Sequence, residues 1–299
     1  MPCASGPCRF GQYGFLHKMI LERNNIDADI ISVSSENNYE GFPTDLRMQL
    51  FKSIMLTDII IKLGCKLRPY ERKPGQVDEL LRKYLQVFAS AISKKERIEK
   101  HLQSLRRAVD NLCIDLKNKK PLVGIVGEIY VRSSPFSNDN LIEKIENREG
   151  EAWLTPFMEW LHYTGYLKKL IHKPILSKLK DDLAATVVDL FEKKYYRFFN
   201  SILSDRKEPG IDDIIEKAKP YFPDAIRGEA VLTVGRTICF IEQGASMIVN
   251  VAPFGCMPGT ISSIILKNIA RIYSIPIVSL YYDGYVGFDS QLEQYLNNI

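Results

Sequence analysis

The second half of the chain alternates short apolar runs with stretches in which apolar residues recur every three to four positions. The runs Leu122–Gly127, 246–251 and 277–281 have the length and the near-continuous apolar character of strands buried in a parallel sheet. Apolar residues at helical spacing over 229–243 and 258–273 predict helices between these strands. This alternation indicates an α/β fold with a doubly wound parallel sheet, in which the three runs are neighbouring strands.

The first half is predicted to be mainly helical. A short buried strand is expected over 28–33, and a long helix over 44–62, with Gly64 where a left-handed residue would end it. Residues 77–117 carry the pattern of two amphipathic helices, and further helices cover much of 155–204.

A polar linker at 118–121 marks a change in character. We therefore predict two domains. Residues 1–118 form a partial α/β unit with helices, and residues 119–299 form an α/β domain with a helical insertion.

The composition excludes several classes of protein. With 45% hydrophobic and 25% charged residues in a chain of 299, the protein can bury a sizeable core, and a net charge of +4 indicates no nucleic-acid partner. No apolar run reaches the roughly 18 residues of a membrane span. The start of the chain has no signal-peptide pattern, so six scattered cysteines predict a cytoplasmic protein with reduced thiols.

Two cysteines lie in turns that suit ligand binding. Cys256 follows a predicted strand and precedes a predicted helix, with Pro258 suited to the first helical turn, and Cys8 also precedes a helix. The positive end of a helix favours the thiolate form, which suits an anionic iron–sulfur cluster. Cys3, five positions before Cys8, is either a third ligand or an accident of the terminus. The other cysteines lie in apolar contexts and are interpreted as core residues: Cys65, Cys113 and Cys239.

Charged residues follow the predicted strands at the same edge as the Cys256 turn. Glu128 and Arg132 come directly after the first strand and are candidate catalytic residues, because a carboxylate can transfer protons and an arginine can bind a phosphate or a carboxylate. The alternative is a surface salt bridge between them. Asp283 occupies a similar position after the last strand.

Four segments, in order along nearly the whole chain, resemble the acyl-CoA dehydratase activase-related proteins, which are relatives of the 2-hydroxyacyl-CoA (2-hydroxyglutaryl-CoA) dehydratase subunits. They are Ala4-Ser5-Gly6-Pro7-Cys8-Arg9-Phe10-Gly11-Gln12-Tyr13, Lys66-Leu67-Arg68-Pro69-Tyr70-Glu71, Gly127-Glu128-Ile129-Tyr130-Val131-Arg132 with Pro135-Phe136-Ser137-Asn138, and Asn250-Val251-Ala252-Pro253-Phe254-Gly255-Cys256-Met257-Pro258-Gly259-Thr260.

The resemblance implies two Rossmann-like doubly wound units with a large helical portion, holding an oxygen-sensitive iron–sulfur cluster, of the 4Fe-4S type, at their interface. Cys8 and Cys256 match the cysteines of the family. Its dehydratases receive one electron from an ATP-hydrolysing activase and dehydrate a 2-hydroxyacyl-CoA. A further family cysteine upstream of Cys8, and the strand before it, have no counterpart here, so we expect an incomplete first unit.

These observations lead to one main hypothesis and two alternatives. The main hypothesis is a cluster-bearing redox protein, a dehydratase-like lyase or a reductase component, that works with an ATP-dependent activase domain or protein and binds an acyl-CoA. The first alternative is a non-catalytic interaction or electron-relay module of a larger activase-related protein. A thiol enzyme without metal is the weakest reading, because no histidine lies near Cys8 or Cys256 in sequence. Association into a homo-oligomer is left open.

Overall fold

The computed structural model describes residues 9–30, 42–170, 175–223, 226, 228–284 and 289–296. Its single described sheet has four parallel strands in the order β2-β1-β3-β4. The strands are β1 (Leu122–Gly127), β2 (Glu151–Leu154), β3 (Met247–Pro253) and β4 (Ile277–Tyr282). The predicted α/β class is confirmed, and so is the prediction that the three apolar runs, now β1, β3 and β4, are neighbouring parallel strands.

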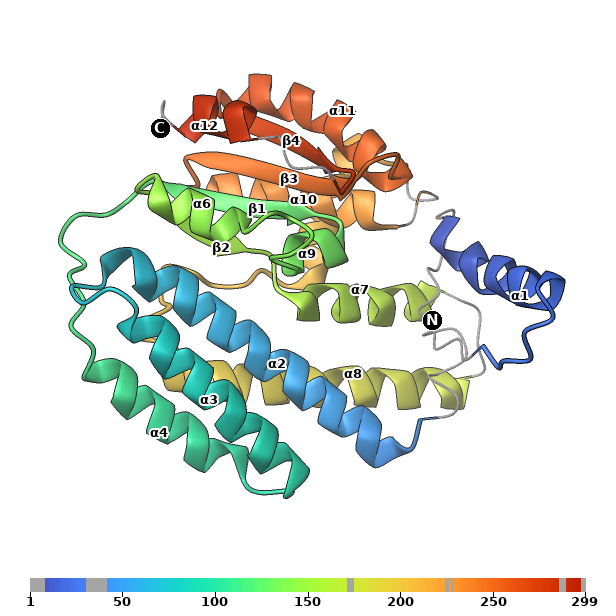
Figure 1. Cartoon of the computed structure of the whole chain (residues 1–299), viewed down its shortest axis with the longest axis horizontal. Coiled ribbons are helices and arrows are strands. Elements are labelled where there is room, and N and C mark those ends of the chain that lie inside the picture. Colours follow the sequence, from blue (N-terminus) through green and yellow to red (C-terminus); the bar gives the residue numbers. More distant parts are fainter. Residues whose placement is uncertain are drawn as a thin grey trace.

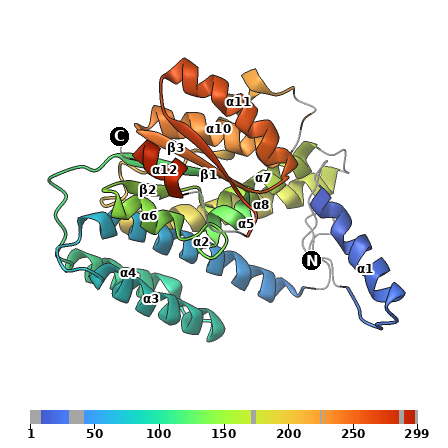
Figure 2. The ribbon, with the colours of Figure 1, turned by 45° about the horizontal axis from the view of Figure 1, so that its top comes forward.

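Helices cover both faces of this sheet, as Figures 1 and 2 show. Alternate strand residues point to opposite faces, so Val123 and Ile125 of β1 pack with α6 and α12, whereas Leu122 and Val126 pack with α10. The covering helices are α5 (Ile129–Ser133), α6 (Leu141–Asn147), α10 (Glu229–Glu242), α11 (Met257–Tyr273) and α12 (Asp289–Leu296). The sheet is therefore doubly wound.

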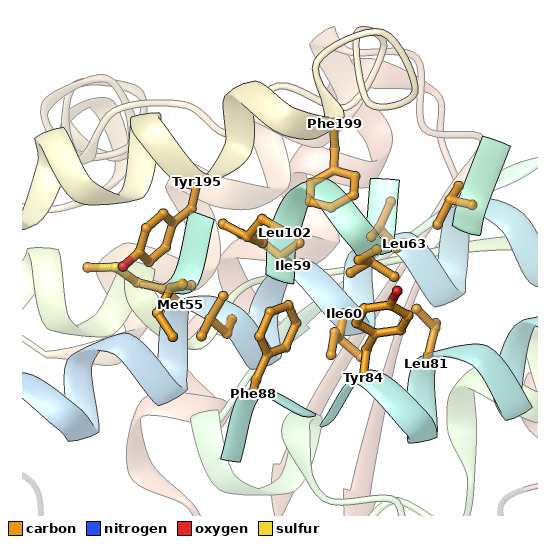
Figure 3. Packing of buried hydrophobic residues seen from close by; sticks show 14 of the residues in the cluster. Met55, Ile59, Ile60, Leu63, Leu81, Tyr84, Phe88, Leu102, Tyr195 and Phe199 are labelled. Atoms are coloured by element: carbon orange, nitrogen blue, oxygen red, sulfur yellow. The ribbon is translucent and has the colours of Figure 1, made fainter. Parts of the chain in front are cut away.

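A second layer, made only of helices, lies along one side of the sheet unit (Figure 1). Its helices are α2 (Thr44–Leu67), α3 (Gln76–Ser93), α4 (Ile98–Asp110), α7 (Phe157–Leu170) and α8 (Ile175–Tyr196), with α9 (Ile211–Ala218) packed on α10. Figure 3 shows its apolar core, in which Ile59 and Leu63 of α2 meet Leu102 of α4 and Phe199. Residues from before and after the predicted domain boundary at 118/119 pack together in this core. The boundary itself stays a prediction.

Helix α1 (Tyr13–Arg23) lies apart from both layers in both ribbon views (Figures 1 and 2), and none of its residues is buried. No second sheet occurs among the described residues. Residues 28–30 form no strand, and the rest of the predicted strand over 28–33 lies outside the described part of the chain. The division into two Rossmann-like units therefore stays a prediction.

The prediction that Gly64 ends the long helix is wrong, because α2 continues to Leu67. A Cβ at Gly64 would lie 3.2 Å from atoms of both Leu81 and Arg68, so this glycine serves the close packing of α2 against α3. Cys113 is also corrected. It is exposed after α4, whereas Cys65 and Cys239 are buried as expected.

Glu208, between α8 and α9, links the helical layer to the sheet through buried charges. Its carboxylate pairs with Lys62 of α2 and Arg236 of α10 and accepts a hydrogen bond of 3.3 Å from the indole nitrogen of Trp153 in β2. Lys62, Arg206 and Arg236 lie 5.4, 5.4 and 5.5 Å from the centre of the Trp153 ring. The tryptophan, 1% exposed, is thus surrounded by cations.

A second buried carboxylate, Glu151 at the start of β2, continues this network. It accepts hydrogen bonds from Arg206 Nη2 at 2.6 Å and from the Tyr70 hydroxyl at 2.7 Å. Lys66 of α2 lies 3.5 Å from Glu151 and 2.8 Å from Asp205. Helix α2 therefore reaches the sheet through ion pairs as well as through apolar contacts.

Gly235 allows α10 to approach α9 closely, because a Cβ there would lie 2.0 Å from the carbonyl oxygen of Ile214. We expect Gly235→Ala to lower the free energy of unfolding by about 1–3 kcal/mol, since backbone rather than a flexible side chain has to move. The matched control is Gly165→Ala in α7, where a Cβ meets nothing within 4 Å. This control gains helix propensity, and equal losses for the two variants in urea unfolding would contradict the prediction.

Candidate functional site

The order of the strands places the candidate site. Strands β1 and β3 lie side by side in the middle of the sheet, with β2 beyond β1 and β4 beyond β3. The connection from β1 to β2 and the connection from β3 to β4 therefore run in opposite directions from the carboxyl edge of the sheet. Such a switch point is where doubly wound sheets bind ligands. Glu128 follows β1, and its N–H donates to the carbonyl of Val251 in β3 at 2.8 Å, so the two strand ends lie against one another.

Cys256 stands at this edge, in the strand–turn–helix corner that the sequence predicts. It is the N-cap residue of α11 and is partly exposed, and Gly255 before it has a φ of +73°, which favours glycine. Gly259 packs against Ala252, where a Cβ would lie 2.6 Å from the alanine methyl group and 3.5 Å from Cys256 Sγ. A glycine at 259 thus keeps α11 close to β3 and leaves room around the thiol.

Cys3 and Cys8 lie outside the described residues, so the expected convergence of Cys8 with Cys256 stays a prediction. Within the described part of the chain, no group of three or more histidine, cysteine, aspartate or glutamate side chains could hold a metal ion. Of the three proposed cluster ligands, Cys3, Cys8 and Cys256, only Cys256 lies within the described part of the chain.

Glu128 acts as the N-cap of α5. Its two carboxylate oxygens accept hydrogen bonds from the backbone N–H groups of Tyr130, at 3.1 Å, and Val131, at 2.8 Å. Both oxygens are thus used to begin a short helix, which is the local reason for an acidic residue directly after β1. The sequence places Glu128 at the correct edge, and its catalytic role stays a prediction.

Arg132 is buried beneath this edge, with only 4% of its surface exposed. Its guanidinium donates to the carbonyl oxygens of Gly127, Thr155 and Pro156, at 2.6, 3.3 and 3.3 Å, and so ties the end of β1 to the segment after β2. A surface salt bridge, the alternative considered for Glu128 and Arg132, is wrong, because Arg132 is not at the surface.

Four carboxyl groups surround Arg132 without forming an ion pair with it among the described residues. Burial lowers the pKa of the guanidinium, and the charges of Glu159, Glu229, Glu128 and Asp58 oppose this effect. Burial also raises the pKa of Asp58, Glu159 and Glu229 to about 7 in each case. Three of the four carboxyl groups around this buried cation therefore have pKa values near neutral pH.

Glu229, the first residue of α10, is a member of this edge that sequence analysis does not identify. Burial, and then the charge of Glu128, raise the pKa of Glu229 to about 7, and Arg132 and the backbone N–H of Ile129 oppose this rise. In the sequence, Glu229 is only an acidic residue after Gly228. Acidic residues are common in the first turn of a helix, so this position does not indicate a functional site.

Two large side chains also project from this edge. Phe254, in the turn after β3, is 76% exposed, and Tyr130, in α5, is 65% exposed. Asp283 is exposed after β4, and Tyr281 of β4 donates a hydrogen bond to the carbonyl of Gly259 at 3.2 Å. The edge therefore combines a thiol, carboxyl groups and uncovered aromatic surface.

Fold and site together define a doubly wound α/β protein with a thiol and a carboxyl pair at its switch point. A scan against protein-family models, a search of curated proteins and a search of solved structures each found no match. The family resemblance therefore depends on the four sequence segments described above. Among the described residues, no helix combines the length and the apolar character that crossing a bilayer requires.

Proposed function

We propose that this protein is an iron–sulfur redox protein of the 2-hydroxyacyl-CoA dehydratase kind, which receives electrons from an ATP-dependent activase. The observation that carries this proposal is the position of Cys256. The residue belongs to one of the four segments of the resemblance and lies at a helix N-terminus on the switch point of a parallel sheet. In this proposal the protein is cytoplasmic.

The surroundings of Cys256 fit a cluster ligand. The thiol is partly exposed, unlike the buried Cys65 and Cys239, whose pKa values burial raises to about 12 and about 11. The N-terminus of α11 stabilises the thiolate form that binds iron. We propose Cys8 and Cys3 as further ligands, brought to the same edge by a first Rossmann-like unit. A bound 4Fe-4S cluster supplies one-electron chemistry.

The aromatic side chains at the edge suit the acyl-CoA part of the proposal. Phe254 and Tyr130 follow β3 and β1, the two strands that meet at the switch point. Covering them with a thioester would bury apolar surface and exclude water from the thiol. The residues of this chain would thereby bind and shield the reacting group.

Anaerobic reconstitution with iron and sulfide tests the proposal. We expect the wild-type chain to bind iron and acid-labile sulfide in equal amounts, and Cys256→Ser to lose most of that iron while its helical content is unchanged. The matched control is Cys113→Ser, which replaces an exposed thiol in the segment between α4 and β1 and should retain the iron. Equal iron content in the two variants would contradict the assignment of Cys256.

The alternative, an interaction or electron-relay module, is favoured by one observation. Helix α1 exposes apolar side chains, among them Phe15, Leu16, Met19 and Ile20, with Phe15 71% exposed. A contiguous apolar helix face commonly marks a contact surface. If the wild-type chain binds no iron under reconstitution, this alternative becomes the better account.

A further inference from the structure

The two edges of the sheet differ in what lies against them. Strand β2, at one edge, packs against the helical layer, where Lys66 of α2 lies 3.5 Å from Glu151, the first residue of the strand. Strand β4 forms the opposite edge, on the side of the sheet away from that layer (Figure 1). Within the described ranges of the chain, no strand pairs with the outer side of β4. The edge at β4 is therefore where the sheet can be extended.

Alternate residues of β4 direct their backbone groups to opposite sides. The carbonyl oxygens of Pro276 and Tyr282 accept hydrogen bonds from the side of β3, at 3.0 and 2.8 Å. In a parallel ladder the N–H and C=O groups of one residue point to the same neighbour, and those of the next residue point the opposite way. The even-numbered residues of β4 therefore bond to β3. The residues whose backbone groups point away from the sheet are Ile277, Ser279 and Tyr281.

Strand β4 has none of the features by which edge strands usually avoid pairing. Between Ile277 and Tyr282 it contains no charged residue, proline or glycine. Its register with β3 runs through all six residues without a bulge. Natural proteins protect edge strands with lysine, proline, bulges or very short strands. A regular and uncharged edge of this length is suited to pairing with another strand.

We infer that two copies of this chain associate by antiparallel pairing of their β4 strands, about a two-fold axis at Ser279. In this register Ser279 lies opposite Ser279 of the second copy, and Ile277 lies opposite Tyr281. Each of these pairs exchanges two backbone hydrogen bonds, so the outward groups of all three residues are used in both copies. The two four-stranded sheets become one continuous sheet. The inference is independent of the proposed function.

The side chains of β4 fit this pairing of the strand with itself. Ile277, Ser279 and Tyr281 lie on one face of the sheet, and each is partly exposed. Across the axis Ile277 meets Tyr281, and a β-branched residue opposite an aromatic one is a favourable cross-strand pair. Ser279 is small, so its two copies fit beside one another at the axis.

The two ends of β4 are also complementary in charge. Asp283 is exposed directly after the strand, and Arg271 is exposed in the last turn of α11, which leads into the strand. In the register about Ser279, Asp283 lies opposite Ile275 of the second copy, one helical turn beyond Arg271. An antiparallel pair therefore brings the acidic end of one strand to the basic end of the other, which favours a second copy as the partner.

Amide hydrogen exchange, measured by NMR at two protein concentrations beside sedimentation velocity, tests this inference. We expect the full chain to form a dimer. Where the dimer predominates, the outward amides of Ile277, Ser279 and Tyr281 should exchange at least about tenfold more slowly than where the monomer does. The amides of Val278 and Leu280 bond to β3 in either state, so they serve as an internal control and should change much less.

A proline at the axis tests the same contact by mutation. Ser279→Pro removes an outward N–H, and an edge strand tolerates proline at such a position. Since each dimer loses two backbone hydrogen bonds, we expect its dissociation constant to rise by about tenfold or more. The matched control Ser279→Ala also loses the hydroxyl that accepts a 3.1 Å hydrogen bond from Asn250, but it keeps the N–H and should dimerise as the wild type does.

A wild-type chain that stays monomeric at every concentration reached would overturn the inference. So would a dimer in which the three outward amides exchange as fast as in the monomer, because that dimer uses another surface. Slow exchange of these amides in the monomer would also overturn it, since the chain would then cover its own edge. If Ser279→Pro does not fold, the contrast between odd-numbered and even-numbered amides of the wild type decides alone.

Discussion

Replacing Glu208 with alanine is expected to lower the free energy of unfolding by about 3–5 kcal/mol, because the change removes the carboxylate that pairs with two buried cations and leaves Arg236 only its 3.5 Å contact with Glu159. Lys62 and Arg236 both pair with this carboxylate, and Arg236 is only 1% exposed. Trp153 also loses the acceptor of its indole N–H. The penalty comes from the charges left behind, and it does not measure the net worth of the intact pair.

Urea unfolding of Glu208→Ala beside a surface control checks this result. Glu242→Ala removes an ion pair with Lys217 in which both side chains are about 40% exposed, so its expected cost is below about 1 kcal/mol. A loss for Glu208→Ala no larger than that of the control would show that water reaches Lys62 and Arg236. The ion pairs would then not hold the helical layer to the sheet.

Local patterns predict the part of the fold that contains the site. The runs that form β1, β3 and β4 are apolar on both faces, and the helices α10 and α11 carry clear apolar faces, so the nearest neighbours in sequence determine their structure. The position of Cys256 follows from the same reasoning. Once parallel strands are predicted, their carboxyl ends must share an edge.

The short elements escape this kind of reasoning. Strand β2 has only four residues, and its first, Glu151, is charged and buried, which no apolar pattern indicates. Helix α5 has five residues and depends on the capping carboxylate of Glu128. In the sequence, Gly64 resembles a residue that ends a helix. In the structure it lies inside α2 and allows close packing against α3, a contact between segments that local sequence patterns do not reveal.

The buried charges are also beyond the reach of the sequence. Lys62 and Lys66 in α2 have the pattern of a solvated helix face, because their partners Glu208, Asp205 and Glu151 come much later in the chain. Glu229 likewise meets Glu128 and Arg132 only after folding. The sequence can place residues at the ends of adjacent strands, whereas the pairing of charges between layers requires the tertiary structure.

The buried carboxyl of Glu159 predicts that stability falls as pH rises between about 4.5 and 7. Burial raises the pKa of this group in the folded protein from 4.5 to about 7, although Arg236 and Arg132 oppose the rise. Between these values the folded protein binds a proton that the unfolded chain has lost, so the free energy of unfolding decreases with pH. From the difference in pKa, Glu159 alone contributes a loss of roughly 2–3 kcal/mol between pH 5 and 8.

Glu159→Gln isolates this contribution, because it keeps the shape of the side chain and removes the titration. Asp58, Glu229 and His162 also have raised pKa values and favour the folded state at the lower pH, so the wild-type decrease exceeds that of Glu159 alone. We expect the free energy of unfolding, measured in urea, to fall less between pH 5 and pH 8 in Glu159→Gln than in the wild type. The difference between the two decreases should equal the contribution of Glu159.

The control Glu216→Gln, at the surface, should show the same pH dependence as the wild type. Parallel pH dependence in the wild type and Glu159→Gln would mean that Glu159 is ionised in the folded protein, held by the 3.5 Å contact with Arg236 Nη1.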